Sequence, residues 1–329
     1  MAALPAASAG ANQLQLVQLE NEWLSISILP EVGAKLYDLI WKPTGRNFLW
    51  HNPRIAPQKY AIEANFDNYW CGGWDEGFPT CDACEHQGES YPNLGELRSL
   101  QWNVVSIDRE RGNQVVRLSA FGPISPVRAE KIVTLVDGAP VVKVNYEITN
   151  LGPGSIDFIW GTHPCLAVTP NMMFRIPART GIVGLSSDAS LGAPGQRYSW
   201  PMIETPAGNA DMSRTRGIDA KMFCGHYVTD LEAGWYAAED SETGEGFLFS
   251  FPVEQCPYLW LWLVYGGWRG YHHVIVEPWT SYPVHLADAV RGGTSRKLAP
   301  GEKFTAEVRA AIYAKPASFE QALRRVQQA

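Results

Sequence analysis

The sequence contains no cluster of lysine or arginine residues, and this absence limits the partners that the protein can have. Its 27 basic residues are outnumbered by 34 acidic residues, which gives a formal net charge of -7. A basic patch is the electrostatic signature of proteins that bind nucleic acid or anionic membranes. We therefore expect no nucleic acid and no membrane as partner, and instead a small ligand with little or no charge.

Cysteine is sparse, and long hydrophobic runs are missing. Six cysteines in 329 residues are too few for a small secreted fold held by disulfides, so we expect reduced thiols and a cytoplasmic location. No stretch approaches the ~20 apolar residues of a membrane-spanning helix. The opening MAALPAASAGANQ lacks the basic and apolar regions of a signal peptide, and we predict that residues 1–13 are disordered.

Motifs for phosphate binding and covalent catalysis are also absent. The glycine-rich pieces GGWRG and CGGWDEG have neither the spacing of a phosphate-binding loop nor a helix after them. There is no G-x-S-x-G turn that would present a nucleophilic serine. Cys81, Cys84 and His86 have the spacing of half a zinc site, but no second CxxC pair completes it. We expect no cofactor and no metal, and chemistry without a covalent intermediate.

Alternating apolar and polar residues, typical of β-strands, run through most of the chain. They occur in LQLVQLENEWLSISILP, NQVVRLSAFG, EKIVTLVDG and PVVKVNYEITN, and again in SIDFIWGTHP, EGFLFSFP, HHVIVEPW and FTAEVRAAIYA. YLWLWLVY is apolar on both faces, which indicates a strand in the middle of a stacked structure. Without linker or repeat, residues 14–329 are predicted to form one domain, a large antiparallel β-sandwich.

The C-terminal SFEQALRRVQQA is the one segment with a clear helical pattern. Ser318 and Gln321 fit a capping box, and Phe319, Leu323 and Val326 fall on one face of a helix. We expect this short helix to pack outside the sheets.

A carboxylate interrupts one of the apolar strands. If residues 272–279, HHVIVEPW, are extended, His273, Ile275, Glu277 and Trp279 share one face. Apolar neighbours disfavour the charged form of Glu277, which suits a general acid or base. A structural ion pair with an arginine is the alternative.

Two other stretches supply polar candidates. His163 lies at the end of the apolar strand in IWGTHPCLAV, where its titration near neutral pH suits proton transfer, although a buried core histidine is the alternative. In the loop 69–90, Asp75 and Glu76 lie between aromatic residues and are placed to hydrogen-bond sugar hydroxyls. The 13 tryptophans offer flat faces that suit either core packing or stacking against a sugar ring.

Together these stretches resemble the galactose mutarotase-like superfamily, which includes aldose 1-epimerases and hexose-6-phosphate 1-epimerases. LPEVGAKLYDLIWKPTGRNFLW resembles the family's opening, WGTHPCLAV its segment with the acid histidine, and VIVEPWTSYP with RKLAPGEKFTAEVRAAIY its base-bearing strand and closing turn. The resemblance implies that Glu277 takes the proton of the anomeric hydroxyl and His163 protonates the ring oxygen. The pyranose then opens and closes again as the other anomer.

The segment YPNLGELRSLQWNV departs from this family at one position. Leu94 stands where the epimerases have a histidine, whereas Gly95, Arg98 and Trp102 remain. His86 from the adjacent loop is the candidate replacement. Arg98 is a candidate ligand contact, with a structural ion pair as the alternative.

The candidate site therefore has two catalytic and six binding residues. Glu277 and His163 are the catalytic candidates, and the substrate-binding candidates are Arg98, Asp75, Trp74, His86, Trp279 and His273. The expected ligand is a monosaccharide or small glycoside, bound by a monomer or homodimer.

Two other functions remain open. Leu94 is compatible with a sugar-binding or sensing protein without activity. A hexose-phosphate epimerase would need converging basic groups, and the candidates Arg98, Arg128 and Arg269 are far apart in the sequence. The scaffold alone does not decide the chemistry.

Overall fold

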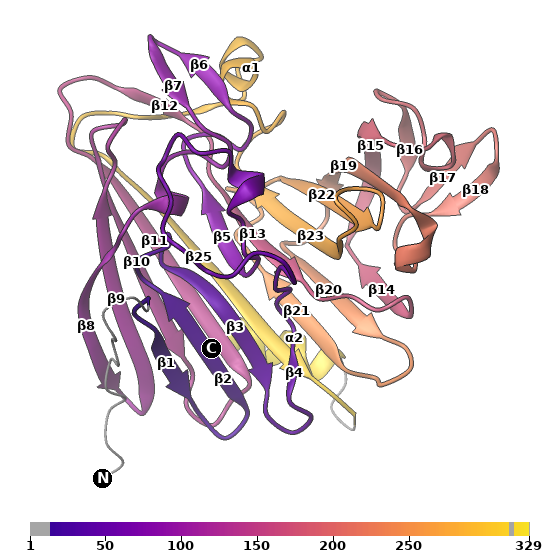
Figure 1. The fold of residues 1–329 in the computed structure, drawn as a ribbon, viewed down its shortest axis with the longest axis horizontal. Coiled ribbons are helices and arrows are strands. Elements are labelled where there is room, and N and C mark those ends of the chain that lie inside the picture. Colours follow the sequence, from indigo (N-terminus) through magenta and orange to yellow (C-terminus); the bar gives the residue numbers. More distant parts are fainter. Residues whose placement is uncertain (1–13, 316–318, 329) are drawn as a thin grey trace.

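In the computed structural model, residues 14–315 and 319–328 are described, and they form two large antiparallel sheets that pack face to face (Figure 1). One continuous core cluster contains buried residues of both sheets, such as Val274 of the first and Val144 of the second. The predicted all-β sandwich is confirmed. The predicted disordered segment 1–13 and Ser318 lie outside the described residues.

The first sheet has 11 strands and carries most of the candidate residues. Its strands are β1 (Val17–Glu20), β2 (Leu24–Leu29), β3 (Lys35–Trp41), β4 (Arg46–Asn47), β5 (Trp74–Gly77), β13 (Gly161–Leu166), β15 (Ala178–Ser186), β16 (Arg197–Ser199), β19 (Met222–Leu231), β22 (Tyr258–Tyr265) and β23 (His272–Trp279). Their order is β1-β2-β3-β5-β13-β23-β22-β19-β15-β16, and β4 pairs with β3. Five strands that are scattered in the sequence, β5, β13, β23, β22 and β19, thus become neighbours.

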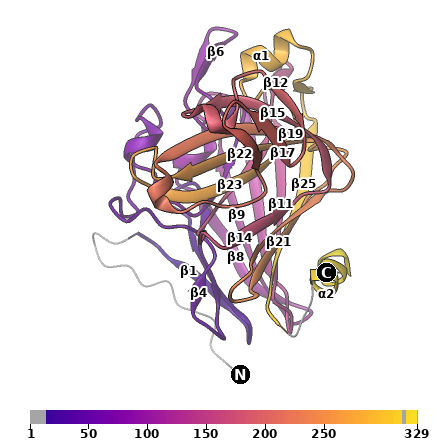
Figure 2. The ribbon, with the colours of Figure 1, turned by 90° about the vertical axis from the view of Figure 1, so that its right-hand side faces the viewer.

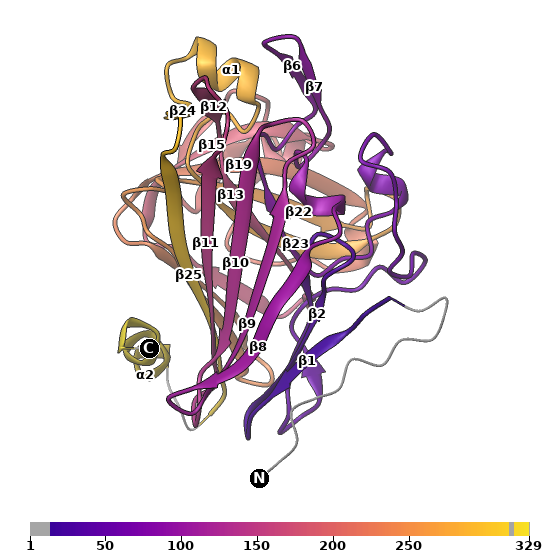
Figure 3. The same ribbon diagram turned by 90° about the vertical axis from the view of Figure 1, so that its left-hand side faces the viewer.

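The second sheet has 8 strands, which Figure 3 shows from its outer side. They are β8 (Asn103–Glu110), β9 (Asn113–Phe121), β10 (Val127–Leu135), β11 (Val141–Asn150), β14 (Met172–Arg175), β20 (Trp235–Asp240), β21 (Gly246–Ser250) and β25 (Lys303–Tyr313). The order is β14-β20-β21-β25-β11-β10-β9-β8. Three two-stranded sheets are β6 (Cys84–His86) with β7 (Glu89–Tyr91), β12 (Ile156–Phe158) with β24 (Arg296–Leu298), and β17 (Met202–Thr205) with β18 (Gly208–Asp211).

Two α-helices lie at the periphery of the described structure, α1 (Leu286–Arg291) near β6 and α2 (Phe319–Gln328) on the outside of β21 and β25 (Figures 1 and 2). Helix α2 confirms the predicted C-terminal helix. Its Phe319 ring lies 4.9 Å from the Trp235 ring, and Ala322 and Val326 are buried beneath it. No helix in the described ranges is long and apolar enough to cross a membrane.

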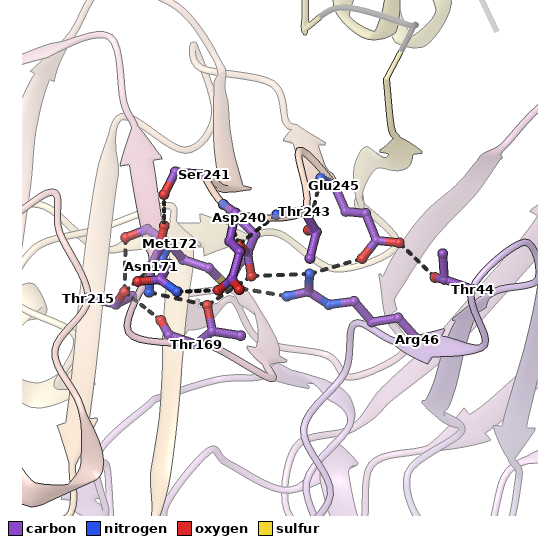
Figure 4. Close-up of polar contacts among 11 residues, drawn as sticks. Thr44, Arg46, Thr169, Asn171, Met172, Thr215, Asp240, Ser241, Thr243 and Glu245 are labelled. Atoms are coloured by element: carbon purple, nitrogen blue, oxygen red, sulfur yellow. Dashed lines mark hydrogen bonds and ion pairs between the residues drawn. The ribbon is translucent and has the colours of Figure 1, made fainter.

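A polar network joins the two sheets at one end of the sandwich (Figure 4). Arg46 on β4 places Nη1 3.1 Å from Glu245 Oε2 and 3.6 Å from Asp240 Oδ2. Thr44 donates to the other Glu245 oxygen at 2.7 Å, and Thr169 donates to Asp240 at 2.9 Å. The network ties β4 of the first sheet to β20 and the turn before β21 of the second sheet.

Candidate functional site

Side chains from five adjacent strands of the first sheet form a row across the face that points away from the second sheet. Asp75 of β5 is in register with His163 of β13, and Glu277 of β23 is in register with Trp260 of β22, which pairs with Tyr227 of β19. His163 Nε2 lies 3.7 Å from Glu277 Oε1, which joins the two halves of the row. Partners in register point to the same side of a sheet, so one line of contacts runs from Asp75 to Tyr227.

A cavity of about 240 Å³ opens over this row, and both His163 and Glu277 line it. Its wall is mainly aromatic, and the aromatic residues are Phe66, Trp70, Trp260, Trp262 and Trp268. The other polar lining residues are Asp67, Asp82 and Asn93. None of the described lining residues is a lysine or an arginine. This combination of apolar walls with a few convergent polar groups is typical of a small-molecule site.

A larger hollow of about 620 Å³ lies on the second sheet, but its central carboxylate, Glu307, is already engaged. Glu307, which lines it, accepts from Asn145 at 2.6 Å and pairs with Arg309 at 2.5 Å. It contains no buried acid–base pair comparable to that of the smaller cavity. The cavity over Glu277 is therefore the better candidate site.

Burial sets the proton balance of the Glu277–His163 pair. Glu277 is 1% exposed, and burial raises its pKa well above its ordinary value, although the hydrogen bond from Trp279 opposes this shift. Burial also lowers the pKa of His163, to about 4. Both shifts favour the uncharged forms of the two groups, so the pair offers one proton donor and one proton acceptor rather than a fixed ion pair.

Trp279 orients Glu277 from below the cavity. Its Nε1 donates to Glu277 Oε2 at 3.0 Å, and the same-face placement of the two residues follows from strand alternation. The ring lies directly over Gly161 and Gly77, where a Cβ would come within 2.3 Å of it. The glycines of β13 and β5 thus leave the space that Trp279 fills, and Trp279 itself does not line the cavity.

Asp75 lies beside the row but is engaged by other groups. It is 1% exposed, and its Oδ2 lies 3.1 Å from Lys35 Nζ and accepts from Trp70 Nε1 at 3.3 Å. Lys35 also donates to the Gly72 carbonyl at 2.8 Å. The structure therefore places Asp75 behind the cavity wall formed by Trp70, in a buried ion pair.

Trp74 and His86 lie away from the cavity. Trp74 is on the other face of β5, in the core between the sheets, where Nε1 donates to Thr162 at 2.5 Å and the ring lies 5.1 Å from Phe249. His86 on β6 places Nε2 3.1 Å from Asp157 Oδ2. Neither residue is placed to contact a ligand at Glu277, and His86 does not take the position of the expected histidine.

Arg98 and His273 support the wall from behind. The Arg98 guanidinium lies 4.9 Å from the Phe66 ring, and its Nε donates to the Asn93 carbonyl. His273 is fully buried, with its ring 5.2 Å from Trp70, and burial lowers its pKa well below its ordinary value. Neither side chain belongs to the cavity lining.

The three arginines considered for phosphate binding do not converge. Arg98 lies behind Phe66, whereas Arg128 pairs with Glu130 on β10 of the second sheet at 2.7 Å. Arg269 is at the cavity rim, where Nη2 lies 3.7 Å from Asp67 Oδ2. No convergent basic site for a phosphate is formed by these residues.

Leu94 lines the cavity, at the position where the family resemblance predicts a histidine. It is 1% exposed and has a φ of 56°, in the left-handed region that leucine rarely adopts. The following Gly95 has a φ of 69°, and a Cβ there would collide with the Phe78 carbonyl. The backbone of this turn is thus held tightly, while the side chain that it presents is apolar.

The cysteine-rich loop does not assemble a metal site. Cys81 is buried in the cavity wall and Cys84 is half-buried on β6, and all six cysteines are free. No group of three His, Cys, Asp or Glu side chains that could hold a metal ion occurs in the part of the chain that the structure describes.

The tryptophans of β22 were missed as site residues from the sequence. Trp260 and Trp262 are half-buried and face the cavity, whereas Leu259, Leu261 and Leu263 are buried in the core. The strand therefore has an aromatic face and an aliphatic face, and it lies inside the first sheet between β23 and β19, as expected for a strand that is apolar on both faces. The signal was present in the strict alternation of aromatic residues with leucine.

Comparison with known proteins identifies solved structures with the same fold. A domain family of unknown function, DUF5107, matches residues 6–90, and no curated protein matches the sequence. A Synechocystis protein has 18% identity and a TM-score of 0.67, covering 94% of this chain and 100% of its own. A candidate aldose 1-epimerase from Klebsiella pneumoniae has 14% identity and a TM-score of 0.72, with 98% and 85% covered.

A third solved structure points to the same group. A galactose mutarotase-like protein from Lactobacillus casei is 15% identical, with a TM-score of 0.62, and 91% of this chain aligns with 100% of it. Identities this low establish the fold and not the activity. The chain has the galactose mutarotase-like fold.

Proposed function

We propose that the protein is an aldose 1-epimerase-type enzyme that interconverts the anomers of a free sugar. The observation that carries this proposal is the pair of His163 and Glu277, buried side by side at 3.7 Å in an aromatic cavity. The candidate aldose 1-epimerase of Klebsiella pneumoniae, with the same fold, is consistent with it.

The chemistry follows from the two proton positions of an aldose. The anomeric hydroxyl and the ring oxygen are bonded to the same carbon, so an acid and a base a few ångströms apart can serve both. Glu277 takes the hydroxyl proton while His163 protonates the ring oxygen, the ring C–O bond breaks, and rotation followed by closure gives the other anomer. The reverse transfers restore the pair.

The raised pKa of Glu277 is compatible with its role as base. Hydroxyl groups of a bound sugar donate hydrogen bonds to the carboxylate and stabilise its charged form, which lowers the pKa. A proton held by Glu277 can then move to His163, whose Nε2 lies 3.7 Å from Glu277 Oε1. When the pair holds one proton, one group can act as the acid and the other as the base.

The charges around the cavity favour an unphosphorylated substrate. Asp67, Asp82 and Glu277 line it, and no lysine or arginine does so among the described residues. A phosphate group inside the cavity would meet carboxylates, and the Arg269 guanidinium at the rim is already paired with Asp67 at 3.7 Å. The proposal therefore concerns neutral sugars.

The test follows the anomers of freshly dissolved α-glucose and α-galactose by polarimetry or NMR. We expect the wild type to accelerate equilibration, and Glu277→Gln and His163→Ala each to lower kcat by about 10²–10⁴-fold, the usual worth of a general acid or base. An absence of acceleration for every sugar tested would overturn the proposal. Sugar binding without any turnover in the wild type would instead identify a binding or sensing protein.

A further inference from the structure

Trp260 lies flat against the first sheet beside Glu277. A Cβ on Gly225 of β19 would come within 2.2 Å of the Trp260 ring, and a Cβ on Gly184 of β15 within 2.6 Å. Two glycines on successive strands therefore make room for this one indole, whose inner face rests on the backbone. Since Trp260 is half-buried and lines the cavity, its other face is open to a ligand.

The indole extends the cavity in one direction. Trp260 is the register partner of Glu277, and on the other side of Glu277 lies His163. The benzo end of the ring reaches over β19 and β15, about 5–10 Å beyond β22 at the usual spacing of strands. Leu185, which is 36% exposed, lines the far end. We call Trp260, Trp262 and Leu185 the aromatic shelf.

The shelf is rigid and has a polar edge. Trp262 is braced by the Phe223 ring at 5.5 Å and the Trp268 ring at 5.8 Å, and Tyr227 packs against Trp260 at 4.4 Å. Asp82 lines the same cavity; burial raises the pKa of both Glu277 and Tyr227, and the charge of Asp82 adds to each shift. A flat apolar surface with a carboxylate acceptor beside it matches a pyranose, which has an apolar C–H face and hydroxyls at its rim.

We propose that the aromatic shelf binds a second sugar ring, so that the preferred substrate is an uncharged reducing disaccharide. Its reducing ring places the anomeric carbon between Glu277 and His163, and the second ring, joined through a hydroxyl remote from that carbon, stacks on Trp260. This substrate class rests on the proposed epimerase function. Binding of a sugar ring to the aromatic shelf does not depend on catalysis.

The experiment compares maltose, cellobiose and lactose with glucose and galactose. We expect the wild type to have a higher kcat/KM for at least one disaccharide than for its monosaccharides. Trp260→Ala should lower the ratio of the disaccharide kcat/KM to the monosaccharide kcat/KM by about tenfold, the usual effect of losing one good aromatic contact. Gly225→Ala should act in the same direction, because the new Cβ displaces the indole. Trp235→Ala, which removes a half-buried tryptophan beside α2, is the matched control and should leave the ratio unchanged.

Binding measured by tryptophan fluorescence separates this inference from the proposed function. If no sugar is turned over but a disaccharide binds more tightly than its monosaccharides, and Trp260→Ala removes the difference, the shelf stands while the epimerase fails. If monosaccharides are turned over and no disaccharide binds or reacts better, the shelf proposal is wrong. If Trp260→Ala lowers kcat/KM by the same factor for disaccharides and monosaccharides, the shelf proposal is also wrong.

Discussion

Two buried glutamates of the first sheet, Glu76 on β5 and Glu277 on β23, are each 1% exposed but have different surroundings. Glu76 points into the core between the sheets and accepts a hydrogen bond from Lys131 Nζ at 2.6 Å. Glu277 points to the cavity, with His163 Nε2 at 3.7 Å. Burial alone therefore does not distinguish a structural carboxylate from a candidate catalytic one.

The partner and the space around it make the difference. Lys131 is also held by the carbonyls of Gly33 and Ala34, at 3.4 and 3.0 Å, so its charge is fixed opposite Glu76. Burial raises the pKa of Glu76 to about 7, with Lys131 opposing the shift. Within residues 14–315 and 319–328, no lysine or arginine pairs with Glu277, and its partner His163 has a lowered pKa, so a proton can move between the two. A titratable partner and an open cavity mark the site.

The largest expected effect comes from Lys131→Met. This change leaves Glu76, whose pKa burial already raises to about 7, without its counter-charge, and at pH 8 it costs about 3–5 kcal/mol of unfolding free energy. Chemical denaturation at pH 8, above the pKa of Glu76, measures this cost. Because neither side chain faces the cavity, the protein that remains folded should keep its turnover.

The double variant Glu76→Gln with Lys131→Met is the control for this comparison. Removing both charges leaves no unpaired buried ion, so much of the lost stability should return. If Lys131→Met alone is as stable as the wild type at pH 8, the view of this pair as a structural element is wrong.

Removing the carboxylate of Glu277 should instead stabilise the protein above about pH 5. Because burial raises the folded-state pKa of Glu277 above its ordinary 4.5, the folded protein holds this proton more tightly than the unfolded chain. The free energy of unfolding that this group contributes below about pH 4.5 is then lost as the pH rises toward the raised pKa, by ~1.4 kcal/mol per pH unit. Glu277→Gln removes this loss and can still accept from Trp279.

The gain in stability of Glu277→Gln over the wild type should thus increase with pH between pH 5 and pH 8, from near zero at pH 5 and by up to ~1.4 kcal/mol per pH unit. Urea denaturation of both proteins at the two pH values measures it. Parallel pH dependences of the two proteins would show that Glu277 is ionised in the folded state throughout this range.

The fold was accessible from the sequence because strand alternation is a local signal. The stretches that became β11 and β25 were recognised from period-two patterns, and helix α2 from its apolar stripe. Helix α1 was not, because its six residues are too few to show a helical period. The order of strands within each sheet depends on long-range packing and could not be deduced from local pattern.

The site was accessible only in part, for a related reason. Strand alternation placed Trp279 on the same face as Glu277. The same alternation puts Trp74 and Asp75 on opposite faces of β5, so the two could not both face a ligand, although both were predicted to bind it. His86 was proposed from nearness in sequence, whereas its partner Asp157 is 71 residues away. The distance of 3.7 Å between His163 and Glu277 depends on β13 pairing with β23, which no local pattern encodes.

The smallest expected effect concerns Leu94, which gives the cavity an apolar side where the family resemblance leads to a polar one. Histidine tolerates the left-handed backbone at this position better than leucine does, so Leu94→His should preserve the fold. A new hydrogen bond to a sugar oxygen is worth ~1 kcal/mol, and we expect KM for a monosaccharide to fall about fivefold. Leu94→Ala is the control, because it removes the same apolar side chain without adding a donor. If the two variants change KM alike, the effect of Leu94 is one of packing, and a polar contact at this wall does not contribute to sugar binding.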